Sequence, residues 1–164
     1  MTEKASGEFS YELKIPEERV AVLIGSAGET KKEIERETRC KLDISKEGDV
    51  TITGDDGLML FTAREIVRAI ARGFNPKIAL LLLKPDYALE IMDLKALAGK
   101  NKNTMERLKG RVIGTGGKAR AEIERLTETA ISVYGKTIGI LGEMNNVSLS
   151  RQAVAMLLQG SMHK

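Results

Sequence analysis

The chain has 164 residues and a net charge of +3, with 42% hydrophobic and only 4% aromatic residues. This composition is typical of a folded, soluble protein, and the length suits one ordinary domain or two small ones. With one cysteine, Cys40, and one histidine, His163, the chain lacks the means to build an internal disulfide, a cysteine-based zinc site or a histidine-centred active site. We therefore expect no metal, no cofactor and no catalysis.

The beginning of the chain is polar, and residues 1–8 are expected to be flexible without forming a secretion signal. The longest apolar run, residues 78–83, is far shorter than the ~20 residues that a membrane span requires. We expect a cytoplasmic monomer that does not attach to membranes.

The first domain is predicted at residues 9–74. Apolar residues alternate over 9–15, which indicates a strand that ends at Pro16. Spacing and punctuation then predict two helices, a hairpin and a third helix, at residues 16–25, 28–39, 41–53 and 58–72. Asp55 and Asp56 are interpreted as turn residues before the third helix.

A linker over residues 75–86 is predicted to contain a short apolar helix that packs the two domains together. The second domain follows at residues 87–160, with a tail at 161–164. The same signals as in the first domain predict a strand, two helices, a hairpin and a last helix, at residues 89–94, 104–113, 118–129, 131–141 and 147–159.

The two halves of the chain repeat at an offset of 89 residues. Residues 24–28 (IGSAG) align with 113–117 (IGTGG), and residues 33–36 (EIER) recur unchanged at 122–125. A repeat of this length in a short chain indicates two copies of one small domain. We predict an α+β fold in which each copy has the order strand, helix, helix, strand, strand, helix.

Each copy carries a Gly-x-x-Gly loop between its first two helices. The first glycine ends a helix in a backbone conformation that other residues resist, and the second begins the next helix without side-chain bulk. The backbone of a nucleic acid can then approach the amide groups and the positive end of the helix dipole. The bases are expected to lie across an apolar groove formed by Val20, Ile24, Val112 and Ile113 with the neighbouring strand.

The candidate binding residues lie in and beside the two loops. In the second copy they are Lys109, Arg111, Val112, Ile113, Gly114, Thr115, Gly116, Gly117, Lys118 and Arg120. In the first copy they are Ile24, Gly25, Ser26, Ala27, Gly28, Lys31 and Lys32.

The two loops differ in charge. Residues 99–125 carry eight basic and three acidic residues, whereas residues 1–98 carry 15 basic and 18 acidic residues. Glu29 follows the first loop directly and would repel a phosphate, although Lys31 and Lys32 partly offset it; Lys118 follows the second loop. The second copy is therefore expected to be the main clamp, and the first to bind weakly or to dock a protein.

The loops and their place between the first two helices resemble the KH family in its type I topology, whose Gly-x-x-Gly loop clamps about four nucleotides of single-stranded RNA. The matching residues are 23–30 and 111–120, and the resemblance covers about 9–160. Residues 64–74 and 109–114 further resemble archaeal relatives of the ribosome-assembly factor called "partner of Nob one". That resemblance implies binding to small-subunit ribosomal RNA near its 3′ end, alongside a dimethyltransferase and an endonuclease. It also implies ribosome-assembly or translation proteins as partners, docked through the first domain.

Two other functions are left open by the sequence. A general RNA-binding factor acting on messenger RNA or in RNA turnover would show the same loops. A phosphate-binding enzyme fits poorly, because Val112 stands where a P-loop requires glycine and Ala119 lacks the hydroxyl that binds magnesium. The preceding helix also excludes a dinucleotide-binding fingerprint, which follows a strand.

Overall fold

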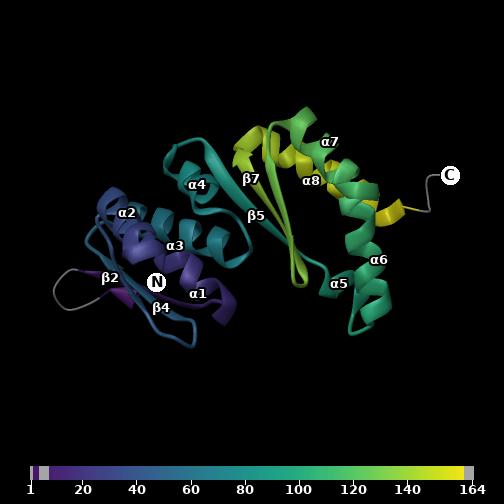
Figure 1. The fold of residues 1–164 in the computed structure, drawn as a ribbon. Coiled ribbons are helices and arrows are strands. Elements are labelled where there is room, and N and C mark those ends of the chain that lie inside the picture. The colour runs from purple at the N-terminus through teal and green to yellow at the C-terminus, as the bar shows by residue number, and fades with distance from the viewer. Residues whose placement is uncertain (1, 4–7, 161–164) are drawn as a thin grey trace. The chain divides into compact units, whose positions relative to one another are not determined.

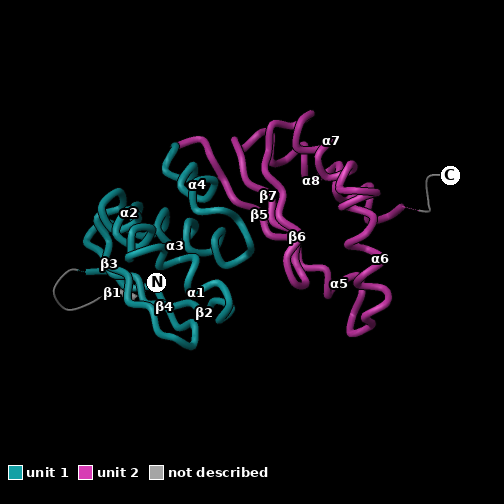
Figure 2. Tube along the Cα trace, in the orientation of Figure 1, with its two compact units in different colours: residues 1–84 teal, residues 85–164 magenta. Residues whose placement is uncertain are grey.

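The computed structural model describes residues 2–3 and 8–160, and it divides into two compact units, residues 1–84 and 85–164 (Figure 2). Each unit is one antiparallel sheet with its three long helices on one face (Figure 1). The predicted α+β class and the predicted order of elements are confirmed in both units. Within the described residues, no helix is long and apolar enough to cross a bilayer.

Unit 1 has the sheet order β1-β2-β4-β3, so the first long strand lies beside the last. Its elements are β1 Thr2–Glu3, β2 Phe9–Lys14, α1 Glu17–Ile24, α2 Glu29–Thr38, β3 Lys41–Ile44, β4 Asp49–Gly54, α3 Gly57–Ala71 and α4 Pro76–Ala79. Asp56 begins α3 as its N-cap, because its carboxylate accepts hydrogen bonds from the amides of Leu58 and Met59.

Both ends of unit 1 differ from the expectation. Thr2 and Glu3, expected to be flexible, pair with Ser10 and Phe9 and add a short strand to the sheet. Residues 1 and 4–7, and the expected tail at 161–164, lie outside the described residues. The predicted linker helix is present as α4 followed by a 3-10 turn over Leu80–Leu83. Both pack on α3, so this segment belongs to unit 1.

Unit 2 has the sheet order β5-β7-β6, which repeats the arrangement of β2, β4 and β3. Its elements are β5 Tyr87–Asp93, α5 Lys95–Ala98, α6 Lys102–Ile113, α7 Lys118–Thr127, β6 Ala130–Tyr134, β7 Thr137–Glu143 and α8 Met144–Gln159. The core between sheet and helices includes Val112, Ile138, Ile140 and Val154, which have no exposed surface.

The short helix α5 was not predicted, and it makes unit 2 longer than unit 1 at one place. From Leu94 to Ile113 the chain runs ten residues further than from Ile15 to Ile24, the corresponding stretch of unit 1. The repeat cannot reveal these residues, because they have no counterpart in the first copy.

Candidate nucleic-acid interface

The two Gly-x-x-Gly loops, residues 25–28 (the first loop) and 114–117 (the second loop), have the same backbone conformation. Gly25 and Gly114 end α1 and α6 with φ of 79° and 74°. Gly28 and Gly117 precede α2 and α7 in the left-handed conformation, with φ of 74° and 79°. The sequence repeat is therefore also a repeat of backbone geometry.

The first glycine of each loop allows the two helices to meet closely. A Cβ atom on Gly25 would lie 2.8 Å from the backbone nitrogen of Thr30, and one on Gly114 would lie 2.7 Å from that of Ala119. No side chain fits at such distances. The tight turn, which places the start of the second helix against the end of the first, requires glycine at this position.

The surface above the second loop is open. A Cβ atom on Gly116 or Gly117 would meet no atom within 4 Å, and Thr115 and Gly116 are exposed. The amides of Gly117 and Lys118 donate to the carbonyls of Gly114 and Thr115, and the loop leads into the start of α7, where the helix dipole is positive. This geometry suits close approach by an anion such as a phosphate.

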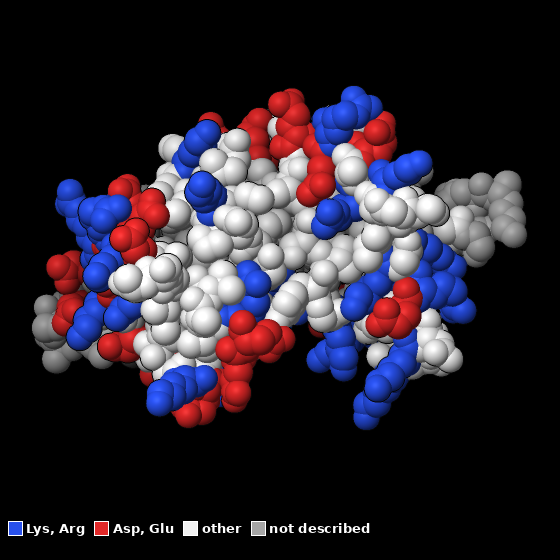
Figure 3. Space-filling model, viewed as in Figure 1, with Lys and Arg blue, Asp and Glu red and all other residues white. Residues whose placement is uncertain are grey.

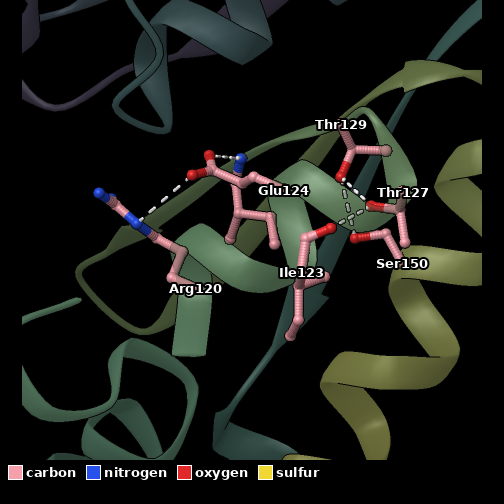
Figure 4. Close-up of polar contacts among 7 residues, drawn as sticks. Arg120, Ile123, Glu124, Thr127, Thr129 and Ser150 are labelled. Atoms are coloured by element: carbon pink, nitrogen blue, oxygen red, sulfur yellow. Dashed lines mark hydrogen bonds and ion pairs between the residues drawn. The ribbon is translucent and has the colours of Figure 1, made fainter. Parts of the chain in front are cut away.

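The four cations predicted beside the second loop have different surroundings. Lys118 is exposed and forms no ion pair with the described residues. Nζ of Lys109 lies 3.8 Å from Oε1 of Glu106. Nε of Arg120 lies 3.9 Å from Oε1 of Glu124 (Figure 4). The guanidinium of Arg111 instead donates a hydrogen bond of 2.8 Å to the carbonyl of Leu158, which ties α6 to the end of α8.

One pair in the basic segment adds no net charge beside the loop. Arg125 donates two hydrogen bonds to Glu122, the shorter at 2.6 Å. These bonds lower the pKa of the Glu122 carboxyl and raise that of the Arg125 guanidinium, so both stay ionised and compensate each other. Figure 3 shows Lys and Arg side chains over α5, α6 and α7 of unit 2, with few acidic side chains over α5 and α6.

The first loop lacks a free cation at the helix start. Ser26 and Ala27 are exposed, and the first residue of α2 is Glu29, at the position of Lys118. Lys31 and Lys32 follow two and three residues later in the same first turn, Lys31 half-buried and Lys32 exposed. The structure thus reproduces the predicted difference in charge between the two loops.

The expected apolar groove needs one correction. Val112 has no exposed surface and belongs to the core of unit 2, so it cannot contact a base. The adjacent Ile113 keeps 36% of its surface exposed, and Val20 and Ile24 are half-buried. Of the two apolar residues predicted to line the groove in unit 2, only Ile113 is therefore accessible.

Two glutamates that the sequence reasoning did not single out hold the loop-bearing helices to the sheets. Glu35 accepts a hydrogen bond of 2.9 Å from the amide of Leu42, and Glu124 accepts one of 2.7 Å from that of Ile131. Both are the second glutamate of the repeated segment EIER, and this repetition is the sequence signal that could have identified them. Thr127, Thr129 and Ser150 extend the polar contacts beside Glu124 (Figure 4). In the described part of the chain, no group of three or more acidic, histidine or cysteine side chains could hold a metal ion.

Family models match both halves of the chain. Residues 88–164 match the model described as a eukaryotic type KH-domain (KH-domain type I), and residues 10–69 match the KH domain model. Both matches fall on the units that carry the Gly-x-x-Gly loops.

Individual relatives extend the similarity over almost the whole chain. A KH domain-containing protein of Methanocaldococcus jannaschii is 51% identical over 155 residues, covering 92% of this chain and 68% of that protein. The pre-rRNA-processing protein pno1 of Schizosaccharomyces pombe is 36% identical over 101 residues, covering 59% of this chain and 41% of that protein. The crystal structure of an a/eIF2alpha–aDim2p–rRNA complex from Pyrococcus horikoshii contains a chain 40% identical to this one, with a TM-score of 0.87 and coverage of 95% and 88%.

Proposed function

Because the chain belongs to the Pno1/Dim2 family of KH-domain proteins, we propose that it binds single-stranded ribosomal RNA of the small subunit during ribosome assembly. The observation that carries the proposal is the second loop, an open glycine turn at the start of α7 with Lys118 beside it. The relatives support the identity of the RNA, since one is named a pre-rRNA-processing protein and another is in a complex with rRNA.

The second domain is the main clamp in this proposal. A phosphate placed over Gly116 meets the positive end of the α7 dipole and the ammonium of Lys118, which both attract it. At the first loop the same phosphate meets the carboxylate of Glu29 instead. The bases of the clamped nucleotides lie against Ile113 and are read on their exposed edges.

The first domain serves mainly to dock a protein of ribosome assembly or translation. Leu58 and Phe61 on α3 are 74% and 51% exposed, and Asp55 and Asp56 lie at the start of the same helix. Exposed apolar side chains with polar residues at their rim are typical of protein-binding surfaces. The a/eIF2alpha subunit in the Pyrococcus complex is one example of such a partner for a relative.

A comparison of single-stranded and double-stranded RNA tests the binding mode. A 12-nucleotide RNA should bind at least 10-fold more tightly alone than when paired with its complement, because the clamp requires splayed bases. Affinity should fall with salt, by about 0.7 log units per phosphate contact for each log unit of salt. Equal or tighter binding to the duplex would contradict the clamp.

Crosslinking in cells distinguishes the proposed role from that of a general RNA-binding factor. Mapped crosslinks should concentrate on small-subunit ribosomal RNA precursors near their 3′ end. Crosslinks scattered over messenger RNAs would favour the general factor.

A further inference from the structure

A hollow of about 630 Å³ lies beside α6, from the start of that helix to Lys109. Four lysines line it: Lys100, Lys102, Lys109 and Lys136. The carboxylate of Glu106 also lines it, 3.8 Å from the ammonium of Lys109. These residues form the lysine hollow, which carries a net charge of about +3.

The lysines come from three segments, which are held by hydrogen bonds that backbone amides donate. The carboxylate of Asp93 accepts a bond from the amide of Lys95 where α5 begins, and the side chain of Asn101 accepts one from Thr104 where α6 begins. The amide of Leu94 donates to the carbonyl of Lys136, which holds the turn of the β6–β7 hairpin against this segment. The lysines thus stand on a fixed frame rather than on free loops.

Unit 1 has the same frame without the lysines. There the amide of Ile15 donates to the carbonyl of Gly48 in the hairpin turn, the counterpart of the bond between Leu94 and Lys136. Helix α1 then begins almost at once, with Glu17 and Glu18 in its first turn. In unit 2 the ten additional residues supply Lys100 and Lys102 at this place, so the insertion changes an acidic corner into a basic hollow.

This arrangement does not favour stability. Helix α6 has no acidic residue in its first turn, and Lys102 is its first residue, where a positive charge opposes the helix dipole. Lys136 in the hairpin turn adds a like charge to the same hollow. A bound anion would offset the repulsion between the lysines. Unfavourable local arrangements of this kind are expected at functional sites.

We propose that the lysine hollow holds a backbone phosphate of the same RNA strand, beyond the nucleotides clamped at the second loop. The inference rests on the proposed function and extends it from a clamp of four nucleotides to a longer site. From Glu106 to Gly114, α6 rises about 12 Å, so a strand that leaves the clamp and follows this helix reaches the hollow. Lysine ammonium groups bind phosphate as point charges, so this contact adds affinity without sequence preference.

RNAs of two lengths test the proposal on the full chain. The variant Lys100→Gln/Lys102→Gln/Lys136→Gln is compared with the unaltered protein on a 4-nucleotide and a 12-nucleotide RNA, the shorter being the 5′ or the 3′ part of the longer. With the 12-nucleotide RNA, affinity should fall about 10-fold or more at low salt, and the salt slope should flatten by about 0.7, the loss of one phosphate contact. With whichever 4-nucleotide RNA binds more tightly, it should change less than twofold.

The control variant Lys41→Gln/Lys46→Gln/Lys77→Gln removes the same charge from exposed positions of unit 1. It should change the affinity for the 12-nucleotide RNA much less than the hollow variant does. Equal losses from the two variants, equal losses with both RNA lengths, or no loss with the longer RNA would each overturn the proposal. If the unaltered protein binds neither RNA, the proposed function itself fails.

Discussion

The two Gly-x-x-Gly loops share a backbone and differ in what surrounds it. Their glycines have φ values within about 5° of each other, and each first glycine lies against the following helix. Yet the first residue of the next helix is Glu29 after one loop and Lys118 after the other. A phosphate at the first loop would therefore meet a negative side chain, and a phosphate at the second loop a positive one.

Contacts that hold the fold are retained in both copies, whereas contacts available to a ligand are not. Glu35 and Glu124 accept the same backbone hydrogen bond from the neighbouring strand. Thr38 and Thr127 donate the same hydroxyl bond one turn back in their helices, to Ile34 and Ile123. The duplicated geometry thus does not by itself imply duplicated binding, and the two domains can be tested against each other.

The largest expected effect comes from placing two carboxylates on the second loop. Thr115→Asp/Gly116→Asp should weaken binding of a 12-nucleotide single-stranded RNA by at least about 100-fold, or roughly 2.7 kcal/mol. The new charges stand where a phosphate would lie, and attraction turns into repulsion. Fluorescence anisotropy of a labelled RNA measures the loss.

The matched control is Thr115→Asn/Gly116→Asn, which has nearly the same shape without the charge. Asparagine and aspartate both tolerate the positive φ of 62° at Gly116, and the space around a Cβ atom there is open. Both variants should therefore melt within a few degrees of the unaltered protein. If the Asn pair weakens binding as much as the Asp pair does, charge is not the cause.

The corresponding change in the first loop should have a smaller effect. Ser26→Asp/Ala27→Asp should weaken binding of the same RNA less than about fivefold, because Glu29 already repels phosphate there. Ser26→Asn/Ala27→Asn is again the control, since Ala27 has a φ of 54° that asparagine tolerates. A loss equal to that at the second loop would show that the two domains share RNA binding and would remove the asymmetry.

Most of the fold follows from the sequence because the repeat and the periodicity agree. Both signals place a helix before and after each loop, and the described structure has them within about two residues. Helix α5 could not be predicted, since it has four residues and its Ala98 is buried only through tertiary packing. Strand β1 could not be predicted for a similar reason, because its two residues form a strand only by pairing with β2.

The candidate site was harder to predict, because side-chain partners depend on tertiary structure. Proximity to the loop suggested that Arg111 contacts phosphate, but its guanidinium reaches the carbonyl of Leu158, 47 positions away. Val112 has an apolar side chain that suits a groove, but the turn of α6 directs it into the core. Lys118 could be placed correctly, since the first residue of a helix after a glycine turn is exposed.

Exchange of single charges at the helix starts should change binding severalfold. Lys118→Ala should flatten the salt slope for single-stranded RNA by about 0.7, the loss of one phosphate contact. Glu29→Lys should tighten non-specific binding and steepen the slope by a similar amount, because it converts the first helix start to the charge of the second. Salt titrations against one oligonucleotide measure both slopes.

Glu29→Gln serves as the control for this exchange, because it removes the repulsion without adding a contact. It should give an intermediate affinity and leave the slope nearly unchanged. If Glu29→Lys weakens binding, the first loop does not face the RNA backbone.

The smallest effect is expected at the far ends of α2 and α7, where the two copies should behave alike. Arg39 and Glu128 follow these helices in the left-handed conformation, with φ of 57° and 55°. Because this conformation strains a residue with a Cβ atom, Arg39→Gly and Glu128→Gly should each stabilise their domain by about 0.5 kcal/mol, after subtraction of the entropy that glycine adds to the unfolded chain. The melting temperature should rise by roughly 2–4 °C in calorimetry, with RNA affinity unchanged.

The control is Arg36→Gly, inside α2, which should instead destabilise the first domain by about 1 kcal/mol, because glycine is unfavourable in a helix interior. A gain in only one domain would show that the shared backbone of the two copies conceals different strain.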